Sequence, residues 1–270
     1  MIIINRLTNQ LRSNPWHCLK QPTFSGSRSI STKAFYTLKD ENCPYIIHNK
    51  SNFQSSRDHN PLDFEFYPNL INQEEQVQWI ESLLLILNRQ YPKRRNKKSK
   101  TKSKILNQEG FEKVDQYDFQ DGHFDTVIKD FREHEIRDLN SISIDSLKKL
   151  INLFPTTNHQ SNLMAHILHL SETGRIDRHV DNPIASGPTI LGLSLGGERV
   201  MHLFGNEEDK EPVYKILLPP GSVYLQRNSI RYSLPHAIPE IDEFQGRNVG
   251  GTQRLSLILR DVKTDHDTIN

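Results

Sequence analysis

Six short apolar segments follow one another after residue 160, and turn-forming residues separate them. They lie at 163–170, 189–195, 199–204, 212–218, 222–226 and 254–260. No stretch between them repeats apolar residues at helical spacing, and Pro219-Pro220-Gly221 predicts a tight turn between two of the segments. Closely spaced strands joined by turns build sandwiches and barrels. The pattern therefore predicts an all-β sandwich or jelly roll.

Helices are expected before this β-rich part. Asn72 and Glu75 have the spacing of a helix capping box, and Pro92 ends the same segment. Apolar residues recur between these points on one side of the expected helix: Val77, Ile80, Leu84 and Leu87. A second helix is predicted for residues 145–153. Ordered structure is expected to begin with the alternating run at 62–68, so the fold class is mainly β, with N-terminal helices packed on the core.

The first 39 residues contain no Asp or Glu, but they contain six Lys or Arg residues among serines and threonines. This composition is typical of a mitochondrial transit peptide, which we assign to residues 1–30, and it predicts a location in the mitochondrial matrix. A disordered basic tail is the alternative. Residues 31–61 are polar without a sustained period and are predicted to be a linker. Residues 263–270 are expected to be a C-terminal tail.

Composition argues against several other classes. The two cysteines, Cys18 and Cys43, both lie early and form no CxxC motif, so neither a disulfide-stapled core nor a structural zinc site is expected. No apolar run approaches the length of a membrane span, so no transmembrane segment is predicted. The 34 Lys and Arg residues nearly balance 33 Asp and Glu, and this net charge by itself does not indicate a nucleic-acid partner.

A charged stretch at 93–125 is predicted to be a mobile loop within the folded domain. Its residues 93–104 include eight Lys and Arg, beginning with Lys93, Arg94, Arg95, Lys97 and Lys98. Such a run is usually solvated, and the alternative is weak contact with nucleic-acid phosphates. The run has no aromatic residues on which bases could stack, so nucleic acid is the less favoured interpretation.

Three potential metal ligands follow the first strand of the β-rich part. His179 and Asp181 are separated by one residue, so in extended backbone their side chains leave the same face. His236 comes 55 residues after Asp181 (236 − 181) and must lie on another strand. Two histidines and one carboxylate form the facial triad that holds Fe(II) and leaves other coordination positions open.

The HxD pattern alone is weak evidence for a metal site. The chain contains twelve histidines and a second copy, His123-Phe124-Asp125, in a polar segment with no strand before it. Surface histidines without a metal are therefore the alternative. The apolar strand that precedes His179, and the Pro183 and Gly187 that follow it, favour the copy at 179–181 as a strand-to-loop junction.

One strand near the C-terminus is predicted to carry two arginines on a single face. Even offsets separate Arg254, Ser256 and Arg260, so their side chains share one face of the strand and the intervening leucines take the other. Because unpaired guanidinium groups inside a barrel are costly, an internal anion is expected, and a dicarboxylate such as 2-oxoglutarate suits them. A wet strand face with arginines paired to surface acids is the alternative. Tyr224, twelve residues before His236, could donate its hydroxyl to a carboxylate or could pack in the core.

The order of these motifs, HxD, a distal His and RxSxxxR, resembles the AlkB family of 2-oxoglutarate/Fe(II)-dependent dioxygenases over residues 62–262. In that family the last motif is commonly RxNxxxR, with Asn where this chain has Ser256. The serine, the sequence at 165–170 and the strand at 192–195 look most like the mitochondrial AlkB homologue 7 branch. The family's Asn-x-Tyr pair before HxD is absent, and His166 and Leu168 occupy that neighbourhood.

The resemblance implies a double-stranded β-helix, a cupin-like jelly roll, with iron at one end. His179, Asp181 and His236 would bind Fe(II). Arg254 would hold the distal carboxylate of 2-oxoglutarate, and Arg260 would lie near the end that chelates the metal. The other residues expected to line the same co-substrate pocket are Tyr224, Leu255 and Ser256.

The implied reaction consumes 2-oxoglutarate and O2 and oxidises a C–H bond. We expect a protein hydroxylase, because the resemblance to the mitochondrial branch implies that this chain lacks the nucleotide-recognition lid of the repair enzymes. A mitochondrial tRNA N-demethylase, with RNA as its partner, is the alternative and would give the basic run at 93–104 a purpose. A non-catalytic module that senses iron or 2-oxoglutarate is the alternative from another class. The resemblance also implies a role in fatty-acid metabolism and regulated necrosis.

Overall fold

The computed structural model describes residues 34–49, 59–91, 106–122, 126–154, 163–206 and 208–261. The strands in these residues are β1 (Tyr36–Thr37), β2 (Ile46–His48), β3 (Phe64–Tyr67), β4 (Gln120–Gly122), β5 (Ile128–Ile136), β6 (Leu163–His179), β7 (Thr189–Gly196), β8 (Arg199–Leu203), β9 (Tyr214–Leu218), β10 (Val223–Arg227), β11 (His236–Ile238), β12 (Ile241–Phe244), β13 (Arg247–Gly250) and β14 (Arg254–Asp261). The helices are α1 (Gln73–Gln90), α2 (Leu147–Ile151) and α3 (Asn228–Ser233), with 3-10 turns at Pro61–Asp63, Val114–Gln116 and Leu139–Ser141.

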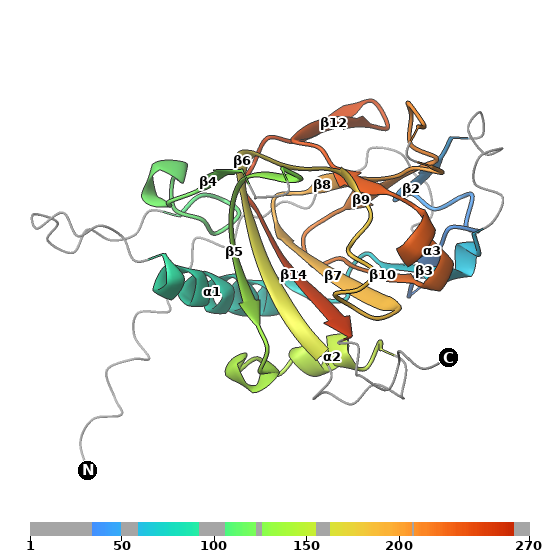
Figure 1. The fold of residues 1–270 in the computed structure, drawn as a ribbon. Helices are drawn as coiled ribbons and strands as arrows, with labels where there is room; N and C mark the ends of the chain where they lie inside the picture. Colours follow the sequence, from blue (N-terminus) through green and yellow to red (C-terminus); the bar gives the residue numbers. More distant parts are fainter. Residues whose placement is uncertain are drawn as a thin grey trace, which may run out of the picture.

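Most of these strands belong to one antiparallel sheet that folds over on itself (Figure 1). Its strands follow the order β1-β3-β10-β7-β14-β6-β11-β8-β9-β2, with β5 added beside β6 and β4 beside β5. Strand β6 joins the two layers, since its residues 163–170 pair with β14 whereas Ile176 and His179 pair with β11. The result is the mainly β, double-stranded β-helix that the sequence predicts.

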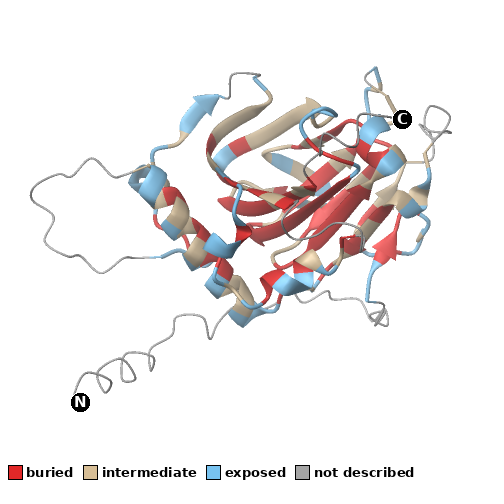
Figure 2. Cartoon of the chain, turned by 60° about the horizontal axis from the view of Figure 1, so that its bottom comes forward, coloured by how far each residue is buried: buried red, intermediate tan, exposed pale blue. Residues whose placement is uncertain are grey.

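Helix α1 covers the outer face of the larger layer and turns its buried side toward the strands (Figure 2). The predicted capping box is present, because the backbone N–H groups of Asn72 and Glu75 each donate to the other's side chain at 3.0 Å. Trp79 is fully buried and donates from Nε1 to Ser146 Oγ at 2.8 Å, which ties α1 to the segment before α2. Both predicted helices therefore exist, and the second is shorter than 145–153.

Successive side chains of β14 point alternately to two sides of the sheet, the apolar core under α1 and the space between the two layers. Leu255, Leu257 and Leu259 are fully buried in the apolar cluster under α1. The residues between them point the other way, into the space between the two layers. A second apolar cluster that includes Phe66 and Ile216 fills part of this space, so the even-numbered residues of β14 border both a core and a cavity.

The predicted linker at 31–61 is wrong for residues 34–49. Tyr36 in β1 pairs with Phe66 of β3, and Ile46 in β2 pairs with Ile216 of β9. The side chains of Tyr36, Leu38 and Ile46 are at most 5% exposed. Strands of two and three residues are too short to show a period in the sequence, which is why this segment resembles a linker.

The predicted loop at 93–125 is also wrong for part of its length. Phe111 is fully buried and stacks on His169, with ring centroids 5.0 Å apart, and β4 pairs with β5. Residues 1–30, the basic run at 93–104, the second HxD copy at 123–125 and the tail at 263–270 lie outside the described residues. Within the described ranges, no helix combines the length and the apolar composition needed to span a bilayer.

Candidate metal and co-substrate site

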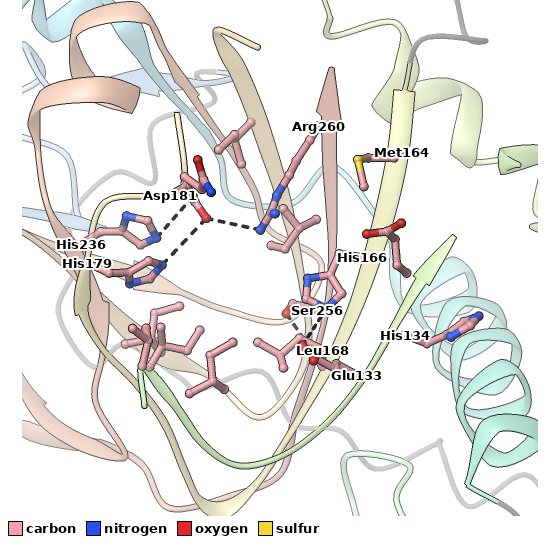
Figure 3. A pocket seen from close by; sticks show the side chains of 18 of the residues that line it. Glu133, His134, Met164, His166, Leu168, His179, Asp181, His236, Ser256 and Arg260 are labelled. Carbon is pink, nitrogen blue, oxygen red and sulfur yellow. Dashed lines mark hydrogen bonds and ion pairs between the residues drawn. The ribbon is translucent and has the colours of Figure 1, made fainter. Parts of the chain in front are cut away.

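The three predicted metal ligands lie together where β6 and β11 meet. His179 is the last residue of β6 and pairs directly with His236, the first residue of β11. Asp181 follows two residues later and faces both rings (Figure 3). Its carboxylate oxygens lie 3.9 Å from His179 Nε2 and 3.8 Å from His236 Nε2. Separations of about 3–4 Å are those of atoms that bind one transition-metal ion at roughly 2 Å each, so the three residues fit a metal.

The orientation of His179 and the charge states of His236 and Asp181 also suit a metal. The backbone carbonyl of Asp177 accepts a hydrogen bond from His179 Nδ1 at 3.0 Å, which leaves Nε2 with its lone pair toward Asp181. Burial, together with the neighbouring His179, lowers the pKa of His236 to about 3, so its ring is neutral at physiological pH. Burial alone would raise the pKa of Asp181, but nearby His236, Arg260 and His179 lower it overall. Neutral imidazoles and an ionised carboxylate are the forms that bind metals.

Arg254 offers a buried positive charge in the cavity that the triad also lines. Its side chain is 1% exposed, Nε donates to Ser194 Oγ at 3.1 Å, and Nη2 has no hydrogen-bond partner among the described residues. Burial lowers the pKa of Arg254 to about 10, which still leaves it charged at neutral pH. Because a buried guanidinium without a counter-charge is costly, this group fits a bound carboxylate.

Arg260 and Ser256 share the face of Arg254, as the even offsets predict. Arg260 Nη2 lies 3.3 Å from Asp181 Oδ1 and so connects the arginine strand to the triad. Ser256 Oγ donates a long hydrogen bond of 3.4 Å to the carbonyl of Leu168 on β6.

Tyr224 reaches the cavity because strand β7 has a glycine opposite it. A Cβ atom on Gly192 would lie 2.3 Å from Tyr224 Cζ, so only glycine lets the ring lie across this strand. Burial raises the pKa of Tyr224 to about 12, which keeps the hydroxyl protonated and able to donate. Tyr224 is therefore a buried hydrogen-bond donor within the same space as the arginines.

One cavity of about 710 Å³ collects most of the predicted site residues. Among the residues that line it are His179, Asp181, His236, Tyr224, Arg254, Ser256 and Arg260. Leu255 is not among them, and the expectation that it lines the pocket is wrong. Its odd-numbered position turns the side chain toward α1, where it is fully buried in the outer cluster.

Two charged residues of this region are not predicted by the sequence pattern. Glu133 on β5 lines the cavity beside Leu168 and pairs with His166 Nε2 at 2.9 Å (Figure 3). Phe131 and Glu133 share one face of β5, but most residues of this strand are charged and obscure any apolar periodicity. Arg231 on α3 binds the backbone that follows Asp181, and no sequence signal marks it, since its acceptors lie 45 to 50 residues away.

A two-layered β-helix that brings two histidines, a carboxylate and buried arginines into one cavity defines the class of non-haem iron oxygenases. The profile of the 2OG-Fe(II) oxygenase superfamily matches residues 63–260. The chain belongs to this superfamily, whose cofactors are Fe(II) and 2-oxoglutarate.

Curated relatives lie in the branch that the motifs resemble. The chain is 34% identical over 142 residues to alpha-ketoglutarate-dependent dioxygenase alkB homolog 7, mitochondrial, of Bos taurus, and 33% identical to the protein of that name from Mus musculus. Each match covers 52% of this chain and 64% of the relative, so it spans a little under two thirds of those proteins. The solved structure of OsALKBH1 is similar with a TM-score of 0.45 and 14% identity, covering 74% of this chain and 96% of that one.

Proposed function

We propose that this chain is a 2-oxoglutarate- and Fe(II)-dependent dioxygenase that hydroxylates a C–H bond of a protein substrate. The observation that carries the proposal is the buried Nη2 of Arg254, which has no hydrogen-bond partner in the part of the chain that the structure describes and lies in the cavity that His179, Asp181 and His236 also line. When bound, the iron and its co-substrate supply the oxidising chemistry, and the protein supplies orientation and seclusion.

Each site residue has a defined part in this proposal. His179, Asp181 and His236 would hold the iron from one side. Arg254 would bind the distal carboxylate of 2-oxoglutarate, with a second hydrogen bond from the Tyr224 hydroxyl. Ser256 lies on the same strand face, between the two arginines. Arg260 would orient Asp181 through their 3.3 Å contact, close to the end of the co-substrate that chelates the metal.

The carboxylates of β5 support a protein substrate over RNA. Glu133 and Glu135 line the cavity from β5, which lies on the other side of β6 from the arginine-bearing strand β14, and carboxylates at this position oppose the approach of phosphates. The basic run at 93–104 supports the second candidate, a tRNA N-demethylase. Deleting this run and measuring tRNA affinity against salt concentration separates the two. Unchanged affinity counts against RNA, whereas a strong loss together with a shallower salt dependence counts against a protein substrate.

Turnover separates an enzyme from a non-catalytic sensor of iron or 2-oxoglutarate. The purified chain with Fe(II), 2-oxoglutarate and air is expected to release succinate, and Asp181→Ala is expected to release none. Binding of 2-oxoglutarate without succinate would support the sensor instead. Succinate release that Asp181→Ala leaves intact would overturn the site assignment.

The acid-free N-terminus and the mitochondrial names of the relatives support a mitochondrial location, and we propose the matrix. A fusion of residues 1–30 to a fluorescent protein should enter mitochondria, and a cytosolic signal would count against this assignment. A role in fatty-acid metabolism and regulated necrosis is proposed from the family resemblance alone. Cells without the protein should then differ in fatty-acid oxidation and in the extent of regulated necrosis, and unchanged cells would contradict this role.

A further inference from the structure

Helix α3 connects two strands of the candidate site and carries a buried arginine. It follows β10, which holds Tyr224, and it ends just before His236 in β11. Arg231 in this helix is 1% exposed, although it lies only five residues from a metal ligand (236 − 231). It is not among the residues that line the cavity, and its hydrogen bonds go to the loop after β6.

The guanidinium of Arg231 donates hydrogen bonds to the loop that contains Asp181. Nη1 donates to the Asp181 carbonyl at 2.8 Å, and Nη2 donates to the Asn182 carbonyl at 3.0 Å. Nη2 also donates to Ser186 Oγ at 3.0 Å. One planar side chain therefore holds three acceptors in the loop between β6 and β7, an arrangement that a lysine ammonium cannot reproduce.

The same loop is fixed at its other end by β14. Gly187 N–H donates to the Asp261 carbonyl at 2.9 Å, and Thr189 N–H donates to the Asp261 carboxylate at 3.3 Å. A Cβ atom on Gly187 would lie 2.6 Å from Asp261 Cγ, so the two segments are in close contact. Asp181 is thus the second residue of a loop that is held at both ends.

Helix α3 is itself anchored on the side away from the loop. Ser229 Oγ donates to Asp63 Oδ2 at 2.6 Å, and Ser229 N–H donates to the same oxygen at 3.1 Å. The helix is therefore fixed to the 3-10 turn at Pro61–Asp63 and, through Arg231, to the metal loop. The helix leads directly into β11, which carries His236. Arg231 therefore connects the segment that carries His236 to the loop that carries Asp181.

We propose that Arg231 is a positioning residue for the metal, which sets the place of the Asp181 carboxylate relative to His236 by holding the Asp181 and Asn182 carbonyls. The inference rests on the proposed iron site. Residues that orient metal ligands without touching the metal typically contribute about 10- to 100-fold to metal affinity. A fully buried arginine directed at a single loop is the form of support that a preorganised site requires.

An anaerobic titration with Fe(II) in the presence of 2-oxoglutarate tests this role, followed by the visible absorption of the ternary complex. Arg231→Met, which keeps the length of the side chain, is expected to weaken Fe(II) affinity by about 10- to 100-fold. Arg231→Lys should recover part of the loss, because an ammonium can still donate to one or two of the acceptors. Ser186→Ala removes one acceptor without changing the arginine and should produce a smaller loss.

Ser229→Ala is the matched control, since it loosens α3 at its other anchor and leaves the loop contacts in place. Its unfolding temperature should fall while its Fe(II) affinity stays at the wild-type value. Wild-type affinity in Arg231→Met would overturn the proposal. So would equal losses of Fe(II) affinity in Arg231→Met and Ser229→Ala, because the arginine would then act only through general stability. Failure of the wild-type chain to bind Fe(II) would overturn the iron site itself, which is a different result.

Discussion

The chemistry of the cavity depends on which residues of a single strand face it. On β14, Arg254, Ser256 and Arg260 reach the cavity, whereas Leu255 lies in the core under α1. This division could be predicted from the sequence, because strand parity is strict. The triad could be predicted from its spacing and its order. Arg231 could not, since backbone carbonyls as partners leave no trace in the residue pattern.

Replacing Arg254 tests the co-substrate pocket at the residue scale. Arg254→Met should raise the 2-oxoglutarate concentration needed for half-maximal succinate release by about 30-fold or more, because truncating one partner of a buried charge pair costs about 2–5 kcal/mol. Arg247→Met is the control, since Arg247 pairs with Glu198 at 3.0 Å and does not line the cavity. An unchanged requirement in Arg254→Met would show that the co-substrate binds elsewhere.

Removing the space for Tyr224 gives an independent test of the same pocket. Gly192→Ala places a methyl group where the Tyr224 ring lies, so the ring must move and its hydroxyl must leave its position. We expect weaker 2-oxoglutarate binding with Fe(II) affinity retained, measured by the same anaerobic titration. Equal co-substrate affinity in this variant and in the wild type would argue that Tyr224 has no contact with the ligand.

At the scale of elements, strands with apolar periodicity could be predicted and the others could not. All six apolar segments after residue 160 are strands, but β6 extends to His179 through a polar stretch that shows no alternation. This extension carries the first ligand, and its pairing with β11 creates the site. Strand β5 is mostly charged and shows no apolar alternation, because both its faces meet polar partners: Glu133 contacts His166 and Arg132 contacts His169.

A buried histidine network between β5, β6 and the segment around Phe111 should make stability depend on pH. His169 is fully buried between Arg132 and Gln253, and burial followed by the charge of Arg132 lowers its pKa well below the ordinary value. As pH falls below about 6.5, His169 binds a proton in the unfolded chain but not in the folded chain. The neutral His169 therefore contributes to the free energy of unfolding above this pH, and this contribution decreases as the pH falls further.

The variant His169→Gln keeps a neutral hydrogen-bonding group and should remove this part of the pH dependence. Urea unfolding of the apo chain at several pH values between 7.5 and 5 is the measurement. The free energy of unfolding should change with pH more steeply in the wild type than in the variant, by up to about 1.4 kcal/mol per pH unit. Parallel curves for the two proteins would mean that His169 titrates normally in the fold.

For the whole molecule, the N-terminal strands complete both edges of the folded sheet. Strand β1 pairs with β3 at one end of the strand order, and β2 pairs with β9 at the other. A domain boundary at residue 62, as the sequence suggests, would leave both edges open. These strands are too short to be predicted from the periodicity of apolar residues, although they cover the edges of the sheet that would otherwise be unpaired.

Comparing chains that begin at residue 31 and at residue 62 tests whether the N-terminal strands stabilise the domain. The longer chain should be the more stable by several kcal/mol, since Tyr36, Leu38 and Ile46 each bury a side chain worth about 1.5–3 kcal/mol. The shorter chain should also associate through its open edges. Thermal unfolding and sedimentation measure both effects, and identical unfolding temperatures would mean that residues 34–49 add nothing to the domain.

We propose that one cavity holds iron on His179, Asp181 and His236, and 2-oxoglutarate on Arg254. The most direct measurement is a crystal structure grown with Fe(II) and 2-oxoglutarate without oxygen, with data collected at the iron absorption edge. We expect one anomalous peak within bonding distance of His179 Nε2, His236 Nε2 and the Asp181 carboxylate, with a carboxylate on the Arg254 guanidinium. Iron bound elsewhere, for example at His123 and Asp125, or an Arg254 without a carboxylate, would contradict it.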